Sequence, residues 1–102
     1  MKFLMTALLL LASTSSFAEV SPKNAGPCLN VAENMAVKLY NNPDTVHETT
    51  IDSVQGDIAR SGVVVYTIST GNTEDGYYPY TIAVQQIFAE DGSVQCKIVS
   101  AK

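Results

Sequence analysis

The chain contains no tryptophan, a single histidine, His47, and only two cysteines, Cys28 and Cys96. Histidine is the usual general base near neutral pH, so this sequence offers little material for acid–base or nucleophilic catalysis. No Gly-x-Ser-x-Gly motif is present either, and we interpret His47 as an exposed residue where a strand begins. We predict that the chain is not an enzyme and has no catalytic residue.

Positive charge is also scarce, because six Lys and Arg residues stand against ten Asp and Glu residues and form no cluster. Binding to a phosphate backbone depends on clustered Lys and Arg that release counterions, so we expect no nucleic-acid partner. The acidic pairs Glu74-Asp75 and Glu90-Asp91 lack the convergent spacing of a calcium loop. We therefore expect no metal site and no cofactor.

The N-terminal apolar run, residues 3–12, is too short for a membrane helix, since it is about half of the roughly 20 residues that cross a bilayer. It follows Lys2 and precedes Ser16-Phe17-Ala18, which has small residues at the −3 and −1 positions of a cleavage site. This is the anatomy of a secretory signal peptide. We predict a signal peptide over residues 1–18 that is removed, no membrane anchor, and a periplasmic or secreted mature chain.

Two cysteines in an exported chain predict one disulfide, Cys28–Cys96. The alternative is a pair of free thiols with a redox role, but such pairs usually have Cys-x-x-Cys spacing. We divide the mature chain into a flexible leader, residues 19–26, and a single domain, residues 27–102. Removal of Lys2 with the signal peptide changes the net charge from −4 to −5. A domain of this size buries only about 60–65% of its unfolded surface, so a covalent link would stabilise it.

Residues 27–41 have helical periodicity, and Pro27 suits a first helical turn. The period then changes to that of strands, with runs at 46–55, 62–70, 77–89 and 93–101. The first run is the weakest, because Ile51 and Val54 would face opposite sides of a regular strand, which indicates a bulge or a sheet edge. Together these patterns predict an α+β fold with one N-terminal helix packed on a four-stranded antiparallel meander sheet.

This arrangement resembles the cystatin-like topology, in which one helix lies across a coiled antiparallel sheet. The resemblance is limited to topology. Cystatins have a Gln-x-Val-x-Gly motif in the first hairpin and a Pro-Trp pair in the second, whereas this chain has Ser53-Val54-Gln55-Gly56-Asp57 and no tryptophan. The resemblance therefore implies a fold but no inhibitory activity and no functional residue.

Alternation assigns the strand residues to two faces. The face that should receive the helix includes Val64, Tyr66, Ile82 and Cys96, and Cys28 lies on the apolar side of the helix. Two independent patterns thus place both sulfur atoms at one interface.

The second face is largely apolar or neutral, and Lys97 is its one charged residue by this pattern. A single helix cannot cover it, and uncovered apolar patches usually mark an interface. The leader or the first strand folded over this face is the alternative. We predict these interaction residues, with two tyrosines at the rim: Val63, Val65, Ala83, Ile87, Val99, Tyr77 and Tyr78.

The sequence predicts a small exported, non-catalytic binding protein that meets a protein partner, or a second copy of itself, through this face. One alternative is a secreted enzyme or an accessory subunit of one, which a convergent pocket with His47 and a carboxylate would favour. Another alternative is a structural component of the cell envelope.

Overall fold

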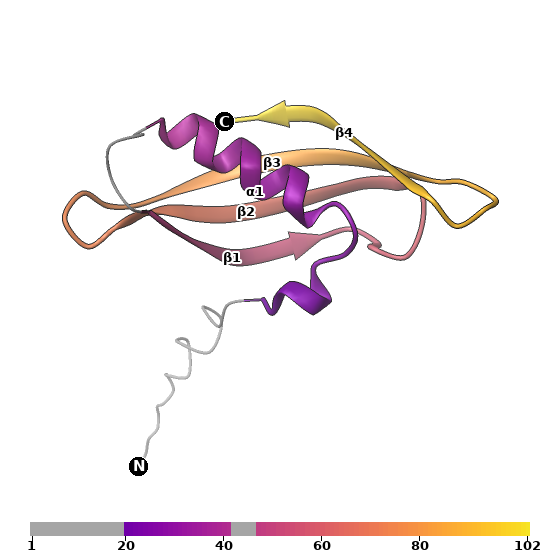
Figure 1. The fold of residues 1–102 in the computed structure, drawn as a ribbon, viewed down its shortest axis with the longest axis horizontal. Helices are drawn as coiled ribbons and strands as arrows, with labels where there is room; N and C mark the ends of the chain where they lie inside the picture. The colour runs from indigo at the N-terminus through magenta and orange to yellow at the C-terminus, as the bar shows by residue number, and fades with distance from the viewer. Residues whose placement is uncertain (1–19, 42–46) are drawn as a thin grey trace, which may run out of the picture.

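The computed structural model describes residues 20–41 and 47–102, so the predicted signal peptide lies outside the described residues. One α-helix packs on a four-stranded antiparallel sheet whose strand order, β1-β2-β3-β4, follows the chain (Figure 1). This confirms the predicted α+β fold class and the meander. The elements are η2 (Pro22–Asn24), α1 (Leu29–Tyr40), β1 (Glu48–Gln55), β2 (Gly62–Asn72), β3 (Gly76–Phe88) and β4 (Val94–Ala101).

The helix α1 buries a stripe of small and apolar side chains against β2, β3 and β4. Leu29, Ala32 and Ala36 are buried at the three- and four-residue spacing of one helix face. The alanines add little bulk between α1 and the sheet. The helix ends at Asn41, whose left-handed backbone (φ 52°) lets its N–H donate to the carbonyl of Val37 at 3.0 Å.

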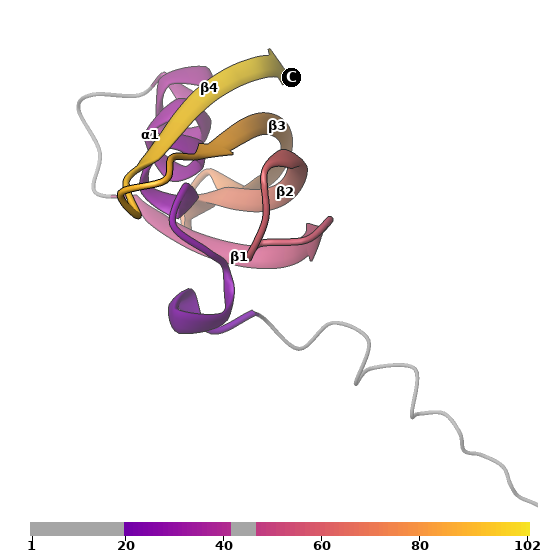
Figure 2. The same cartoon turned by 90° about the vertical axis from the view of Figure 1, so that its right-hand side faces the viewer.

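The two faces of the sheet follow the predicted alternation. Val64, Tyr66, Ile68, Ile82 and Val84 are completely buried under α1. In the view of Figure 2, β1 passes below α1 and β4 above it, so the sheet curls around the helix. The face under α1 is therefore concave and the opposite face is convex.

Both edge strands contain a β-bulge. In β1 the register shifts between Ile51 and Ser53, which turns Ile51 and Val54 toward the same side. The predicted irregularity of this strand is thereby confirmed, at an edge of the sheet. In β4 the register shifts near Val99, since Ile98 pairs with Val84 but Ser100 pairs with Ala83. Bulges bend a strand and increase its twist, so bulges in both edge strands favour the curl around α1.

The segment that we expected to be a flexible leader contacts the folded domain at two points. The N–H of Val20 donates to the carbonyl of Ile51 at 2.8 Å. The buried hydroxyl of Tyr66 donates to the carbonyl of Ala25, also at 2.8 Å. Ala25 itself is completely buried, so the packed domain includes residues that precede Pro27.

Candidate functional site

The two cysteines form the predicted disulfide. The sulfur atoms of Cys28 and Cys96 are 2.04 Å apart and their Cα atoms 5.6 Å apart. Cys28 is buried immediately before α1, and Cys96 lies on the helix side of β4. The bond links the start of α1 to the edge strand β4 and so fixes the helix to the sheet.

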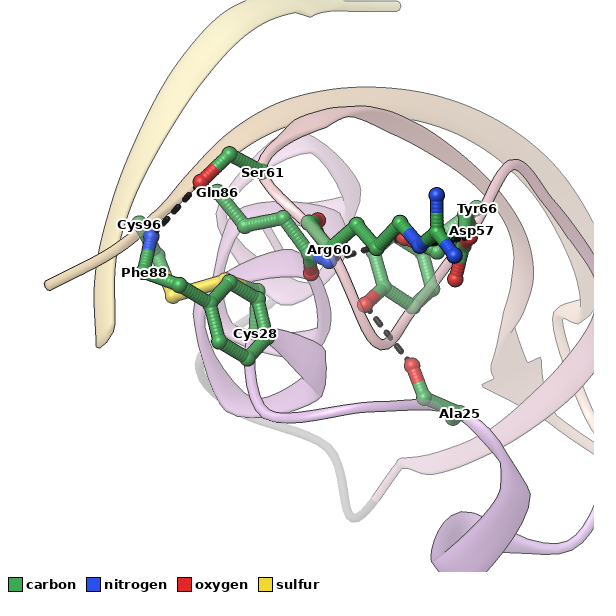
Figure 3. Close-up of a disulfide and its surroundings, with 9 residues drawn as sticks. All are labelled: Ala25, Cys28, Asp57, Arg60, Ser61, Tyr66, Gln86, Phe88 and Cys96. Carbon is green, nitrogen blue, oxygen red and sulfur yellow. Dashed lines mark hydrogen bonds and ion pairs between the residues drawn. A yellow bond between two sulfur atoms is a disulfide. The ribbon is translucent and has the colours of Figure 1, made fainter. Parts of the chain in front are cut away.

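Polar groups close to the disulfide hold the β1–β2 connection in place (Figure 3). Gln86, which pairs with Cys96 in the sheet register, is completely buried. Its Nε2 donates to the carbonyls of Asp57 and Arg60 at 3.0 and 2.7 Å. The hydroxyl of Ser61 accepts a hydrogen bond from the N–H of Phe88 at 2.9 Å. These contacts hold the turn against β3 and satisfy the amide nitrogen of Gln86, whereas its Oε1 is buried without a hydrogen-bond partner among the described residues.

His47 is exposed just before β1, as expected, and its ring lies edge-to-face on the ring of Tyr40 with centroids 6.3 Å apart. Within residues 20–41 and 47–102, no group of three His, Cys, Asp or Glu side chains could hold a metal ion. None of the helices in this part of the chain is long and apolar enough to cross a membrane.

The convex face, here called the open face, contains most of the predicted interaction residues. Val65 and Ala83 are paired neighbours at its centre and are half-buried. Val63 and Ile87 flank them and are 50% and 42% exposed. Val99 is 57% exposed, but it is the extra residue of the β4 bulge, so it stands outside the regular alternation.

Charge on the open face is confined to the edge strands, because β2 and β3 contain no charged residue at all. Lys97 of β4 pairs with Gln85 at one side. At the other side the β1 bulge brings the carboxylate of Asp52 to the hydroxyl of Ser69, which donates a hydrogen bond to it. Asp52 was missed because the conflict between Ile51 and Val54 left the residues of this strand without an assigned face.

Tyr77 and Tyr78 do not form one rim, because adjacent strand residues point to opposite faces. Tyr77 belongs to the open face, where it reaches across Gly71 and its hydroxyl donates to Oε1 of Glu48 at 2.7 Å. This hydrogen bond, with smaller effects of burial and of the carboxylate charge, raises the pKa of Tyr77. Tyr78 belongs to the helix side, so the predicted tyrosine rim is split between two surfaces.

A surface hollow of about 410 Å³ lies on the helix side, at the end of α1 and beside the β2–β3 turn. Tyr78 and Tyr80 face it because even-numbered residues of β3 point toward the helix. The described residues that line it are Tyr40, Asn41, Asp75, Tyr78 and Tyr80. Sequence reasoning singled out the tyrosines of β3 but missed Tyr40 and Asp75. These two residues could not be found from local sequence patterns, because the residues that line the hollow come from α1, the β2–β3 turn and β3.

Comparisons with family models, with curated proteins and with solved structures found no match to this chain.

Proposed function

We propose that this chain is a small exported binding protein, without catalytic activity, that holds another protein against its open face. The observation that carries the proposal is a curved sheet whose two central strands contain no charged residue and whose outer side leaves Val63 and Ile87 about half exposed. Patches of this kind, rimmed by polar residues, mark interaction sites. A disulfide is compatible with the oxidising compartment that export implies.

The dimensions of the open face indicate a modest interface. β2 has 11 residues, so it is roughly 35 Å long. Four strands are roughly 15–20 Å wide, and the two edge strands are shorter. The face then offers on the order of 500 Å² in outline, close to the roughly 600 Å² per partner at the lower end of specific interfaces. The open face is therefore large enough for an interface at the small end of the specific range.

The curvature of the sheet selects the kind of partner. Because the sheet curls around α1, the open face is convex (Figure 2). Two copies placed face to face would set one convex surface against another and touch along a narrow band. A different protein with a concave, apolar groove would cover more of the face. We therefore assign the partner to this second class.

The proposal is tested by recovering proteins from the exported fraction on immobilised mature chain. The decisive variant is Ile87→Lys, which places a charge on the open face, and burial of an unpaired charge is costly. The matched control is Asn34→Lys, which adds the same charge on the exposed side of α1. Circular dichroism checks that both variants are folded.

A partner retained by the wild type and by Asn34→Lys, but lost with Ile87→Lys, supports the proposal. A partner retained equally by all three forms, or no partner, contradicts it. A dimer in analytical ultracentrifugation that Ile87→Lys dissociates would identify a second copy as the occupant and overturn the assignment to a different protein.

A further inference from the structure

The tyrosine-lined hollow lies on the helix side of the sheet and has no residue in common with the open face. In Figure 1 the C-terminal end of α1 and the β2–β3 turn lie at the same end of the molecule. The side chains of Tyr40, Tyr78 and Tyr80 meet the acidic turn residue Asp75 there. A site at this position is independent of the protein-binding face proposed above.

The wall that contains Asp75 is held by a hydrogen-bonded turn. The side-chain oxygen of Asn72 accepts hydrogen bonds from the N–H groups of Glu74 and Asp75 at 3.0 and 2.7 Å. Gly76 closes the turn with φ 86°, a conformation that favours glycine. The hydroxyl of Tyr78 donates to the carbonyl of Asp75 at 2.8 Å. The carboxylate is thus presented from a defined backbone rather than from a loose loop.

The aromatic wall is arranged around the same carboxylate. Tyr40 donates from its hydroxyl to Oδ2 of Asp75 at 3.0 Å. The ring centroids of Tyr40 and Tyr78 are 6.2 Å apart, and their planes are inclined at 32°. A group in the hollow can therefore lie within about 6 Å of both ring centroids, the range over which a cation is attracted to an aromatic face.

Three features of the hollow favour positive charge. Ring faces are electronegative, and Asp75 contributes a carboxylate. The hollow also lies at the C-terminal end of α1, the negative end of the helix dipole. None of the five described lining residues is Lys or Arg.

The hydrogen bonds within the hollow indicate which kind of cation fits. Oδ2 of Asp75 already accepts hydrogen bonds from Tyr40 and from Nδ2 of Asn72, at 3.0 and 3.3 Å. A guanidinium or a primary ammonium ion requires several acceptors, whereas a quaternary ammonium ion requires none. Ring faces with a nearby carboxylate are the surroundings in which quaternary ammonium groups are recognised.

We propose that this hollow, formed by Tyr40, Tyr78, Tyr80 and Asp75, binds a quaternary ammonium group. The test is an NMR chemical-shift titration of the mature, disulfide-bonded chain with choline. The neutral tert-butyl analogue of choline has the same shape without the charge and serves as the ligand control. Glucose is titrated in parallel, since tyrosines beside a carboxylate could instead receive a sugar.

Variants separate the contributions of ring and charge. Tyr78→Leu removes a ring face and should weaken choline binding roughly threefold to tenfold. Tyr78→Phe keeps the ring face but loses the hydroxyl that donates to the carbonyl of Asp75, so it should weaken choline binding less than Tyr78→Leu does. Asp75→Asn keeps the shape and loses the charge, so it should weaken binding at least about fourfold. The matched controls are Tyr77→Leu, on the opposite face, and Glu90→Gln, in another turn, and neither should change the affinity.

Equal binding of choline and its neutral analogue would overturn the proposal. So would binding of glucose alone, the absence of any shift with choline, or unchanged affinity in Asp75→Asn. Where choline binds, sedimentation with phosphatidylcholine vesicles identifies its source: a chain retained by the vesicles recognises a lipid headgroup, and a chain left in solution recognises a free cation. Both results support a quaternary ammonium site.

Discussion

Reduction of the Cys28–Cys96 disulfide should cost this domain a large part of its stability. The bond joins residues separated by 68 positions, so the closed loop contains nearly the whole domain. In the chain-entropy model, a loop of this length stabilises the folded state by about 4 kcal/mol at 25 °C. At typical values per residue, a domain that spans residues 20–102 has a free energy of unfolding of roughly 4–13 kcal/mol. The disulfide is therefore expected to supply a third or more of the total.

The measurement compares oxidised wild type, reduced wild type and the double variant Cys28→Ala, Cys96→Ala by thermal and urea denaturation. Reduced wild type keeps both side chains, so it isolates the covalent bond from the cavity that alanine would leave at the buried Cys28. At about 4–8 °C per kcal/mol for a domain of this size, reduction should lower Tm by roughly 15–30 °C. The double variant should lose slightly more.

The urea dependence tests the mechanism. If the bond acts by restricting the unfolded chain, the oxidised protein should expose less surface on unfolding and show a smaller m-value than the reduced protein. A shift of Tm by only a few degrees, with both thiols shown to be free, would refute the loop-entropy argument. It would mean that α1 and β4 are held chiefly by the packing around them.

Three further predictions test the packing. Val63→Lys should change the free energy of unfolding by less than about 0.5 kcal/mol. Val64, the next residue along β2, is completely buried, so Val64→Lys should unfold the domain. Equal urea midpoints for the two variants would show that the two faces of β2 are misassigned. Burial raises the pKa of Tyr66, so the folded state releases the hydroxyl proton at a higher pH than the unfolded chain does. The folded state therefore loses stability as the pH rises above the ordinary tyrosine pKa of about 10. The stability lost above that pH should be smaller in Tyr66→Phe, and an identical pH profile would contradict this. Gly71→Ala would place a Cβ in steric overlap with the carbonyl oxygen of Gly76, so the free energy of unfolding should fall by about 1–3 kcal/mol. An unchanged Tm would contradict this and show that the turn can move aside.

The parts of the fold that could be predicted from sequence are those in which the polarity of each residue indicates whether its position is buried or exposed. Alternation in β2 and β3 separated buried from exposed positions because both strands pair along their length without a bulge. Ile51 and Val54 are both apolar and both belong in the core, yet a regular strand would turn them to opposite sides. This conflict predicted the irregularity in β1. The disulfide followed because two such patterns converged on Cys28 and Cys96.

The parts that were missed depend on contacts between distant segments. Ala25 belongs to the core because Tyr66, 41 positions later, donates its hydroxyl to the carbonyl of Ala25, and no periodicity in the leader indicates this. Gln86 is polar on a largely apolar face, so alternation alone gave no reason to bury it. Its burial becomes favourable only when the turn carbonyls of Asp57 and Arg60 come within reach.

The charged residues are distributed unevenly over the domain, since the two central strands contain none. Acidic side chains are placed in the turns at both ends of the sheet, at Asp57, Glu74 and Asp75, and Glu90 and Asp91, where they stay hydrated. The central strands contain no charged side chain. Binding at the open face would therefore desolvate few charges, and burying an unpaired charge is costly. Like-charged ends also repel other copies of the same chain, which disfavours stacking through the turns. Under the proposed function, a partner with a neutral groove would desolvate few charges at the open face, so the cost of burying charge would be small.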